Sequence, residues 1–419
     1  MRPCTELLQY VKICSLYGAG FYYIPGTDTC LKIGGFVRAE MNVHAGGSLT
    51  AYQNGGITAD ARSQTAYGTL RAFVYMAPTN TNHSGAYNKV YSPAGFIQWA
   101  GFTFGVTDSF FSFDGQGYTN GSLWAANNDP NGMPLFAYTA QFGNGLSASL
   151  SVEDTNGRRT AVLGNSQTYA GREWPDLVGN LRIDQAWGSA QIMGALHNVH
   201  TYDNAAGATA SNEQHKLGYA LGAGVKFNLP MLGHGDYVQG QFTYMKGALG
   251  YMASNESAPS GGKDPASSFL LGTGDNYGNT NALRANKLAY GDLFDAVGTN
   301  AGGGLDLTTA WGLTAGYEHH WNPMWKTSLY GSYAKIDYSS AASAALIAAK
   351  NLGTTGDADF DIWQIGSRTV WTPVHNLDFS VDLVYSQVDT AFKGQAVKGG
   401  GTYGDIGFLS GIFRVQRNF

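Results

Sequence analysis

The segment LKIGGFVRAEMNVH at residues 31–44 alternates between mostly apolar and mostly polar side chains. Its odd positions are Leu31, Ile33, Gly35, Val37, Ala39, Met41 and Val43, and its even positions are Lys32, Gly34, Phe36, Arg38, Glu40, Asn42 and His44. Successive residues of a β-strand point to opposite faces of the sheet. The segment therefore predicts a strand with one apolar and one water-facing side. The same split recurs at 57–64, 69–76 and 377–383.

The composition narrows the class of protein around these strands. The chain has 419 residues with 58 Gly, and 13% of its residues are charged, where soluble domains have roughly 25%. No run approaches the roughly 18 to 20 apolar residues of a membrane-spanning helix. The net charge of -5 and the lack of a Lys/Arg run argue against a nucleic-acid partner. A secreted β-rich protein and a transmembrane β-barrel remain open.

The spacing of strands and turns favours the barrel. The pattern predicts sixteen strands, at 30–44, 52–64, 68–77, 92–100, 102–110, 134–143, 145–154, 176–186, 189–203, 216–228, 236–251, 308–321, 325–338, 359–372, 377–390 and 403–419. After the first strand, long and short connections alternate, as in an up-and-down antiparallel barrel. A Greek-key sandwich has no reason to keep this rhythm. The longest connection, 252–307, is interpreted as one large loop, with an interdomain linker as the alternative, and 341–350 as a short loop helix.

Tryptophan and cysteine positions add two expectations. Many Trp residues lie near predicted strand ends, which is typical of interfacial aromatic girdles, although ordinary core positions are the alternative. Cys14 and Cys30 bracket a Gly/Tyr-rich segment, and a bridge between them would contribute about 3 kcal/mol and imply an oxidising compartment. Two separate thiols are the alternative, and Cys4 is expected to be free. No secretory signal follows Met1, so either a signal was removed or the protein is cytosolic.

Four segments carry a family resemblance: YVKICSLYGAGFYYIPGTDTCLKIGGFVRAE at 10–40, SQTAYGTLR at 63–71, AGFIQWAGFTFG at 94–105 and RVQRNF at 414–419. Together they resemble the general porins of alphaproteobacterial outer membranes. The resemblance implies an N-terminal segment at 1–29 and a single sixteen-stranded, trimeric, water-filled barrel at 30–419. It also implies that the third long connection, 111–133, folds into the lumen and narrows it, and that Phe419 helps the barrel-assembly machinery recognise the chain.

Charged residues suggest where solutes are selected. Four arginines fall on the water-facing side of the first three strands and the last one, which become neighbours when the barrel closes: Arg38, Arg62, Arg71 and Arg414. We expect them to line one wall of a constriction. On the inward loop, Asp114 and Asp129 would supply the opposite charge, and Tyr118 and Trp124 would narrow the opening. The alternative is that these arginines only neutralise Asp60, Glu40 or Asp382.

The leading functional hypothesis is a general diffusion porin in contact with outer-membrane lipid and lipopolysaccharide, which passes small hydrophilic solutes. We expect no catalysis, cofactor or metal. His319 and His320 are adjacent and so point to opposite faces of a strand, which argues against joint metal binding. A solute-specific channel is the alternative within transport. An outer-membrane hydrolase and a soluble β-sandwich adhesin are alternatives from other classes.

Overall fold

The computed structural model describes residues 12–43, 49–81, 87–113, 115–121, 123, 125, 132–160, 162–163, 167–169, 174–203, 213–252, 293–299, 304–350, 353–396 and 402–419. Within these ranges, no helix has both the length and the apolar character needed to cross a lipid bilayer.

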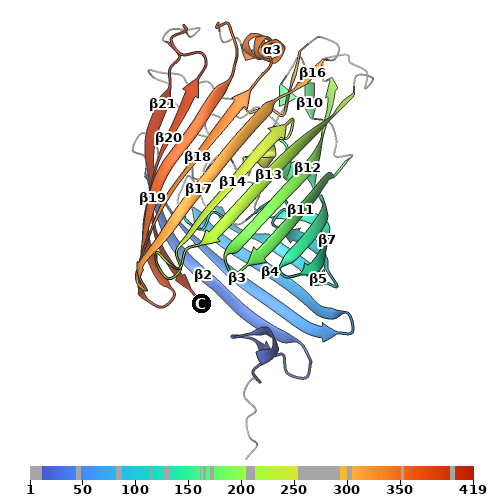
Figure 1. Ribbon diagram of the computed structural model, residues 1–419, viewed down its shortest axis with the longest axis vertical. Helices are drawn as coiled ribbons and strands as arrows, with labels where there is room; N and C mark the ends of the chain where they lie inside the picture. The colour runs from blue at the N-terminus through green and yellow to red at the C-terminus, as the bar shows by residue number, and fades with distance from the viewer. Residues whose placement is uncertain are drawn as a thin grey trace, which may run out of the picture.

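Long antiparallel strands dominate the fold (Figure 1). Sixteen of them form the wall of a barrel: β2 (Cys30–Val43), β3 (Leu49–Thr65), β4 (Gly68–Thr81), β5 (Tyr87–Trp99), β6 (Phe102–Thr107), β7 (Met133–Gly143), β8 (Leu146–Glu153), β11 (Asp176–Gln185), β12 (Gly188–Asp203), β13 (Gln214–Asn228), β14 (Tyr237–Lys246), β17 (Thr309–Asn322), β18 (Trp325–Asp337), β19 (Phe360–Val374), β20 (Leu377–Thr390) and β21 (Ile406–Asn418). The predicted number of strands is confirmed.

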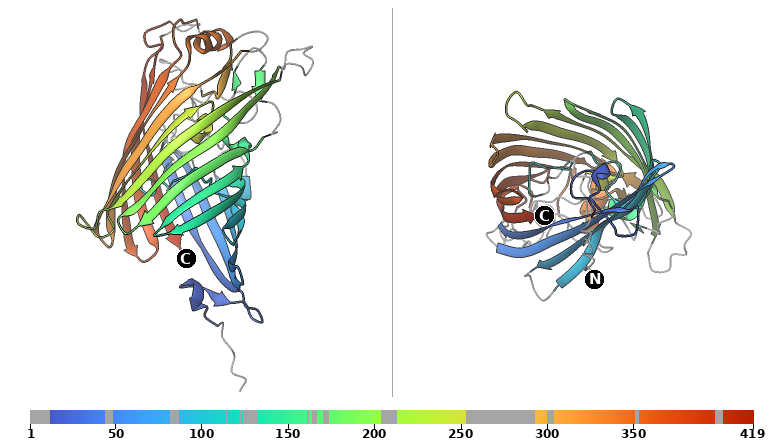
Figure 2. Two further views of the ribbon diagram at one scale, coloured as in Figure 1. Left: turned by 45° about the vertical axis from the view of Figure 1, so that its right-hand side comes forward. Right: turned by 90° about the horizontal axis from the view of Figure 1, so that it is seen from below.

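The barrel closes where the last strand pairs with the first. β21 and β2 are antiparallel, with Arg414 opposite Glu40 and Gln416 opposite Arg38. Past the end of this ladder, Gly35 and Phe419 exchange two backbone hydrogen bonds, of 3.0 and 2.9 Å. Figure 2 shows the closed sheet from below, along the barrel. Closure gives every wall strand a neighbour on each side, and the backbone groups within the ladders are satisfied inside the sheet.

Short turns lie at one end of the barrel and longer connections at the other, as predicted. The helix α3 (Ser340–Lys350) lies among the longer connections, at the opposite end from the C-terminus (Figure 1). Some strand boundaries differ from the expectation. β6 ends at Thr107 and not near 110, and β14 ends at Lys246 and not near 251. β14 stops because Gly247 turns the chain at φ +63°, into the 3-10 helix η4 (Leu249–Tyr251).

The outer surface of the barrel is apolar. On β2, Ile33, Val37 and Met41 are exposed, whereas Glu40 on the opposite parity is buried. The other wall strands show the same separation, with exposed Leu, Ile, Val and Phe on the outward parity. A soluble sandwich would bury this face, so the apolar belt indicates contact with lipid. Trp99, Trp187, Trp321, Trp325 and Trp371 lie on the surface at strand ends or turns, in agreement with an interfacial girdle.

Part of the interior is filled by an apolar cluster. It joins inward-facing residues of many wall strands, such as Met193 and Ile362, to side chains from the long connections, such as Phe111, Phe294 and Phe392. Residues Leu293, Val297 and Leu305 of the predicted 252–307 loop are buried. The short strands β15 (Ala296–Gly298) and β16 (Leu305–Leu307) in this loop pair with each other, and β15 also pairs with β9 (Val162–Leu163). These pairings join two long connections, and the sequence pattern did not predict them.

The N-terminal segment lies beyond the start of β2, at the end of the barrel that carries the short turns (Figure 1). It contains the 3-10 helix η1 (Ser15–Tyr17) and the short strand β1 (Tyr22–Tyr23), which pairs with β2. A disulfide joins Cys14 to Cys30 and confirms the predicted bridge. Both cysteines are fully buried with Phe21 in a small cluster of their own. Cys4 lies outside the described residues.

Candidate functional site

Two groups of charged side chains face the interior near the seam of the barrel. In the first group, pairing between β2 and β21 places Glu40 opposite Arg414. Arg414 Nε donates a hydrogen bond to Glu40 Oε1. Arg38 Nε donates to Gln416 Oε1 at 2.8 Å and lies 3.5 Å from Glu40 Oε1. Two guanidinium groups thus share one carboxylate, so this group carries a net positive charge.

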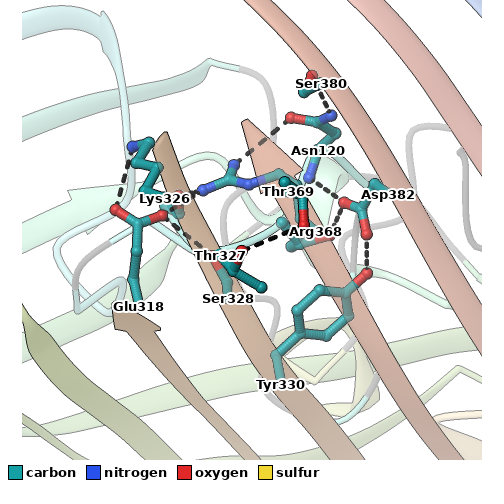
Figure 3. Close-up of polar contacts among 12 residues, drawn as sticks. Asn120, Glu318, Lys326, Thr327, Ser328, Tyr330, Arg368, Thr369, Ser380 and Asp382 are labelled. Atoms are coloured by element: carbon teal, nitrogen blue, oxygen red, sulfur yellow. Dashed lines mark hydrogen bonds and ion pairs between the residues drawn. The ribbon is translucent and has the colours of Figure 1, made fainter. Parts of the chain in front are cut away.

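The second group lies on the neighbouring strands β17, β18 and β19 (Figure 3). Glu318 Oε2 lies 2.6 Å from Arg368 Nη2, and Glu318 Oε1 lies 3.0 Å from Lys326 Nζ. Ser328 donates a third hydrogen bond to the same carboxylate, at 3.0 Å. Arg368 and Glu318 are both buried, and a buried carboxylate requires such partners to remain charged. Neither residue is among those predicted from the sequence.

The first part of the third long connection lies against these interior groups. Thr119 Oγ1 and the Asn120 N–H donate to Asp382 Oδ2 at 2.8 and 2.5 Å. Asp382 also accepts a hydrogen bond from the Tyr330 hydroxyl (Figure 3). The Asn120 side chain donates to Ser380 Oγ at 2.8 Å. The loop is therefore attached to the inner wall through its backbone as well as its side chains.

Two arginines complete the attachment from the wall. Arg414 Nη2 donates to the Asn120 carbonyl at 2.8 Å, and Arg414 Nη1 donates to Asn120 Oδ1 at 3.1 Å. Arg368 Nη2 donates to the Gly117 carbonyl at 2.5 Å. A hydrogen bond from a charged donor contributes more than one between neutral groups. Arg368 Nη1 also donates to Asn120 Oδ1 at 3.4 Å, so Asn120 contacts an arginine of each charged group.

Tyr118, which the sequence predicts to narrow the opening, packs against the inner wall. Its ring lies 5.9 Å from the Tyr330 ring, centroid to centroid, and its side chain is buried. A Cβ on Gly316 would lie 2.5 Å from the Tyr118 ring, so only glycine lets the ring approach the β17 backbone this closely. Burial raises the pKa of Tyr118 to about 12, so its hydroxyl stays neutral at physiological pH.

The four predicted wall arginines do not form one group. Arg62 and Arg71 lie opposite each other near the 65–68 turn, and both bind Asp60, at 2.7 and 3.0 Å. Arg62 pairs in register with Cys30, eight residues before Arg38 on β2, or about 26 Å along the strand. The single wall is therefore corrected to two separate groups. Residue parity fixes the face of the sheet but not the height along the barrel.

The predicted loop acids and the predicted loop tryptophan are not placed. Asp114, Trp124 and Asp129 lie outside the described residues. In the described part of the site, the carboxylates beside the arginines are Glu40, Glu318 and Asp60, all on wall strands. These pairs agree with the alternative in which Glu40 and Asp60 neutralise arginines.

Comparison with known proteins places this geometry in a family. The sequence profile of the porin subfamily matches residues 4–405. The chain belongs to this porin subfamily. Such proteins reside in the bacterial outer membrane, and the apolar outer belt of this porin suits that location.

Individual relatives agree with the family assignment. Porin Omp2b of Brucella abortus is 30% identical over 218 residues, which are 48% of this chain and 60% of that relative. The match thus spans less than two thirds of the Brucella protein. The outer-membrane channel DcaP of Acinetobacter baumannii has a similar fold, with a TM-score of 0.63 and 13% identity, over 95% of this porin and 99% of DcaP. An anion-selective porin from Comamonas acidovorans also has a similar fold, with a TM-score of 0.50 and 13% identity. The match covers 94% of this porin and 100% of the Comamonas chain.

Proposed function

We propose that this porin is a general diffusion channel, through which small hydrophilic solutes and ions cross the outer membrane passively. The observation that carries the proposal is the attachment of the loop segment 115–121 to the inner wall by Arg368, Asp382 and Arg414. A diffusion pore needs a polar lumen and a fixed constriction. A loop attached inside the barrel at its charged seam provides both. Neither catalysis nor a cofactor is part of the proposal.

The proposed constriction lies between the attached loop and the seam strands β2 and β21. Arg38 and Arg414 supply positive charge on the wall, and Tyr118 fixes the position of the loop backbone. In the two charged groups together with Asp382 of β20, four basic side chains (Arg38, Arg368, Arg414 and Lys326) face three acidic ones (Glu40, Glu318 and Asp382). Among these described wall residues, basic side chains therefore outnumber acidic ones by one. The family resemblance adds Asp114, Trp124 and Asp129 of the loop to the proposal.

Assembly and partners belong to the same proposal. The porin resemblance supports a homotrimer in contact with outer-membrane lipid and lipopolysaccharide. The exposed ring of Phe419 lies at the closing seam, where the barrel-assembly machinery would recognise the end of β21.

Liposome swelling with uncharged sugars of increasing size tests the proposal. A general diffusion channel gives rates that fall steadily with sugar size and do not saturate with concentration. Correctly folded protein that admits no sugar of any size would refute it. Purified protein that hydrolyses ester or glycoside substrates would favour the hydrolase alternative.

A solute-specific channel is the second candidate, because aromatic rings line the inner wall between Arg38 near the seam and Arg71 near the 65–68 turn. Phe73 stacks on Phe96 at 5.1 Å, and Phe36 lies 6.3 Å from Tyr75, centroid to centroid. The guanidinium groups of Arg71 and Arg38 lie over rings at the two ends of this row, 5.1 Å from Phe73 and 4.9 Å from Phe36. Saturable uptake of one ring-bearing solute, lost in Phe73→Ala, would favour this candidate.

A further inference from the structure

Two histidines face each other at the end of the hairpin β12–β13, on the side of the long connections. His200 on β12 lies directly opposite His215 on β13. Their rings are 3.9 Å apart, centroid to centroid, and nearly parallel at 11°. Glu213 precedes His215 by two residues, and its Oε2 lies 3.7 Å from His200 Nε2. One nitrogen from each ring and one carboxylate oxygen lie within 4.8 Å of one another.

The position of the cluster separates it from the proposed constriction. On β12, His200 shares its parity with Leu196, and on β13, His215 shares its parity with Leu217; both leucines are exposed on the outer surface. The cluster therefore lies on the outward-facing parity of the wall. Asp382 on β20 and Arg414 on β21 instead contact Asn120 of the loop inside the barrel. A ligand at His200 would thus arrive from outside the barrel, at the loop end.

We propose that His200, Glu213 and His215 bind a divalent transition-metal ion such as Zn²⁺. Two imidazoles and one carboxylate form a donor set that Zn²⁺ accepts, with water as the fourth ligand. Ca²⁺ and Mg²⁺ prefer oxygen donors, so they bind this set weakly. Because the ligands come from two adjacent strands, a bound ion would clip the end of β12 to β13.

The exposure of the three side chains suits such a site, because one is buried and two are exposed. His200 is 1% exposed, so its ring is held in place, whereas Glu213 and His215 are exposed and can rotate toward an ion. Asn198 Nδ2 lies 3.4 Å from His215 Nδ1. A polar partner on one ring nitrogen orients the imidazole and leaves the other nitrogen for the metal.

Calorimetric titration of untagged, chelator-treated porin in detergent with ZnCl₂ tests the proposal. We expect one Zn²⁺ per chain. His215→Ala and His200→Ala should each weaken binding at least tenfold, and Glu213→Gln should weaken it less. His234→Ala is the matched control, because His234 is an exposed histidine in the turn at the other end of the barrel. It should bind as the wild type does.

Two outcomes overturn the proposal. One is a wild-type protein that takes up no Zn²⁺, and the other is unchanged binding in the exposed-site variant His215→Ala, whose fold is the less easily disturbed. Repeating the titration with excess Ca²⁺ adds a check on ligand class. Displacement of Zn²⁺ by Ca²⁺ would point to an oxygen-ligand site elsewhere and contradict the assignment to these histidines.

Discussion

Arg368 and Asp382 lie directly opposite each other on β19 and β20, and both side chains bind the same stretch of the third long connection. Arg368 donates to the Gly117 carbonyl, while Asp382 accepts from Thr119 and from the Asn120 N–H. One cross-strand pair thus fixes both the donors and the acceptors of a four-residue loop segment. Loop position and wall charge are therefore coupled in this porin.

Asp382→Ala should loosen the loop and widen the pore. The change leaves the Asn120 N–H and the Thr119 and Tyr330 hydroxyls without their shared acceptor, at a cost of about 1–3 kcal/mol in unfolding free energy. We expect a higher single-channel conductance and faster entry of large sugars. Asp378→Ala is the control, because Asp378 lies on the same face of β20 but binds Thr372, at 2.6 Å. Equal conductance in both variants would contradict loop attachment by Asp382.

Replacing seam arginines should change ion selectivity, whereas replacing those near the 65–68 turn should not. Arg38→Ser removes a positive charge from the proposed constriction, so the reversal potential in a salt gradient should shift toward cations. Arg71 lies about 26 Å from Arg38 along the wall, which is beyond the Debye length of about 10 Å at 0.1 M salt. Its charge is also paired with that of Asp60. An equal shift of the reversal potential in both variants would show that the seam arginines and those near the 65–68 turn act as one wall.

The disulfide should stabilise the N-terminal segment without affecting transport. Cys14→Ser removes a bridge across a sequence separation of 16 residues, which contributes about 3 kcal/mol in the chain-entropy model. We expect faster proteolysis within residues 12–29 and unchanged conductance. Cys4→Ser is the matched control and should match the wild type in both assays. A loss of conductance in Cys14→Ser alone would mean that this segment also supports the pore.

Asp236, in the turn before β14, should make stability depend on acid pH. Burial of its carboxyl favours the neutral form, but hydrogen bonds from the His320 N–H at 2.8 Å, from His319 at 2.6 Å and from Tyr317 at 2.7 Å lower its pKa to about 2. A depressed pKa stabilises the folded state above the unfolded value of 3.8, and this contribution is lost as the pH falls to about 2.

The Asp236→Asn variant isolates this contribution. Urea unfolding should show the wild type to be more stable than the variant at pH 5, and the difference should shrink as the pH falls from 4 toward 2, the window set by the two pKa values. A difference that stays constant across this range would mean that the hydrogen bonds, and not the charge, stabilise the turn.

The strands of this porin were readable because each carries its own alternation. The segment around Val37 and Arg38 places one side chain outside and the other inside, and the structure agrees. Alternation within 360–374 also places Arg368 on the inward face, together with Gln364, but the predicted arginines all lie on the first three strands and the last one. The candidate wall was therefore incomplete for a reason that the pattern itself could have corrected.

Heights and loop contacts could not be read in the same way. Arg62 lies near one end of the barrel because it pairs with Cys30, and this register is set by the backbone hydrogen bonds between β2 and β3. The contact of Asn120 with Arg414 joins residues 294 positions apart. A periodic pattern carries no information about such pairs, so the constriction needed the structure.

Single-channel current across a planar bilayer, recorded in a salt gradient, tests the central claim most directly. We expect ohmic steps that close in thirds, with a reversal potential that shifts toward cations when Arg38 is replaced by Ser. Folded protein that passes no current would contradict a diffusion channel, and a reversal potential that is unchanged in Arg38→Ser would contradict the proposed constriction.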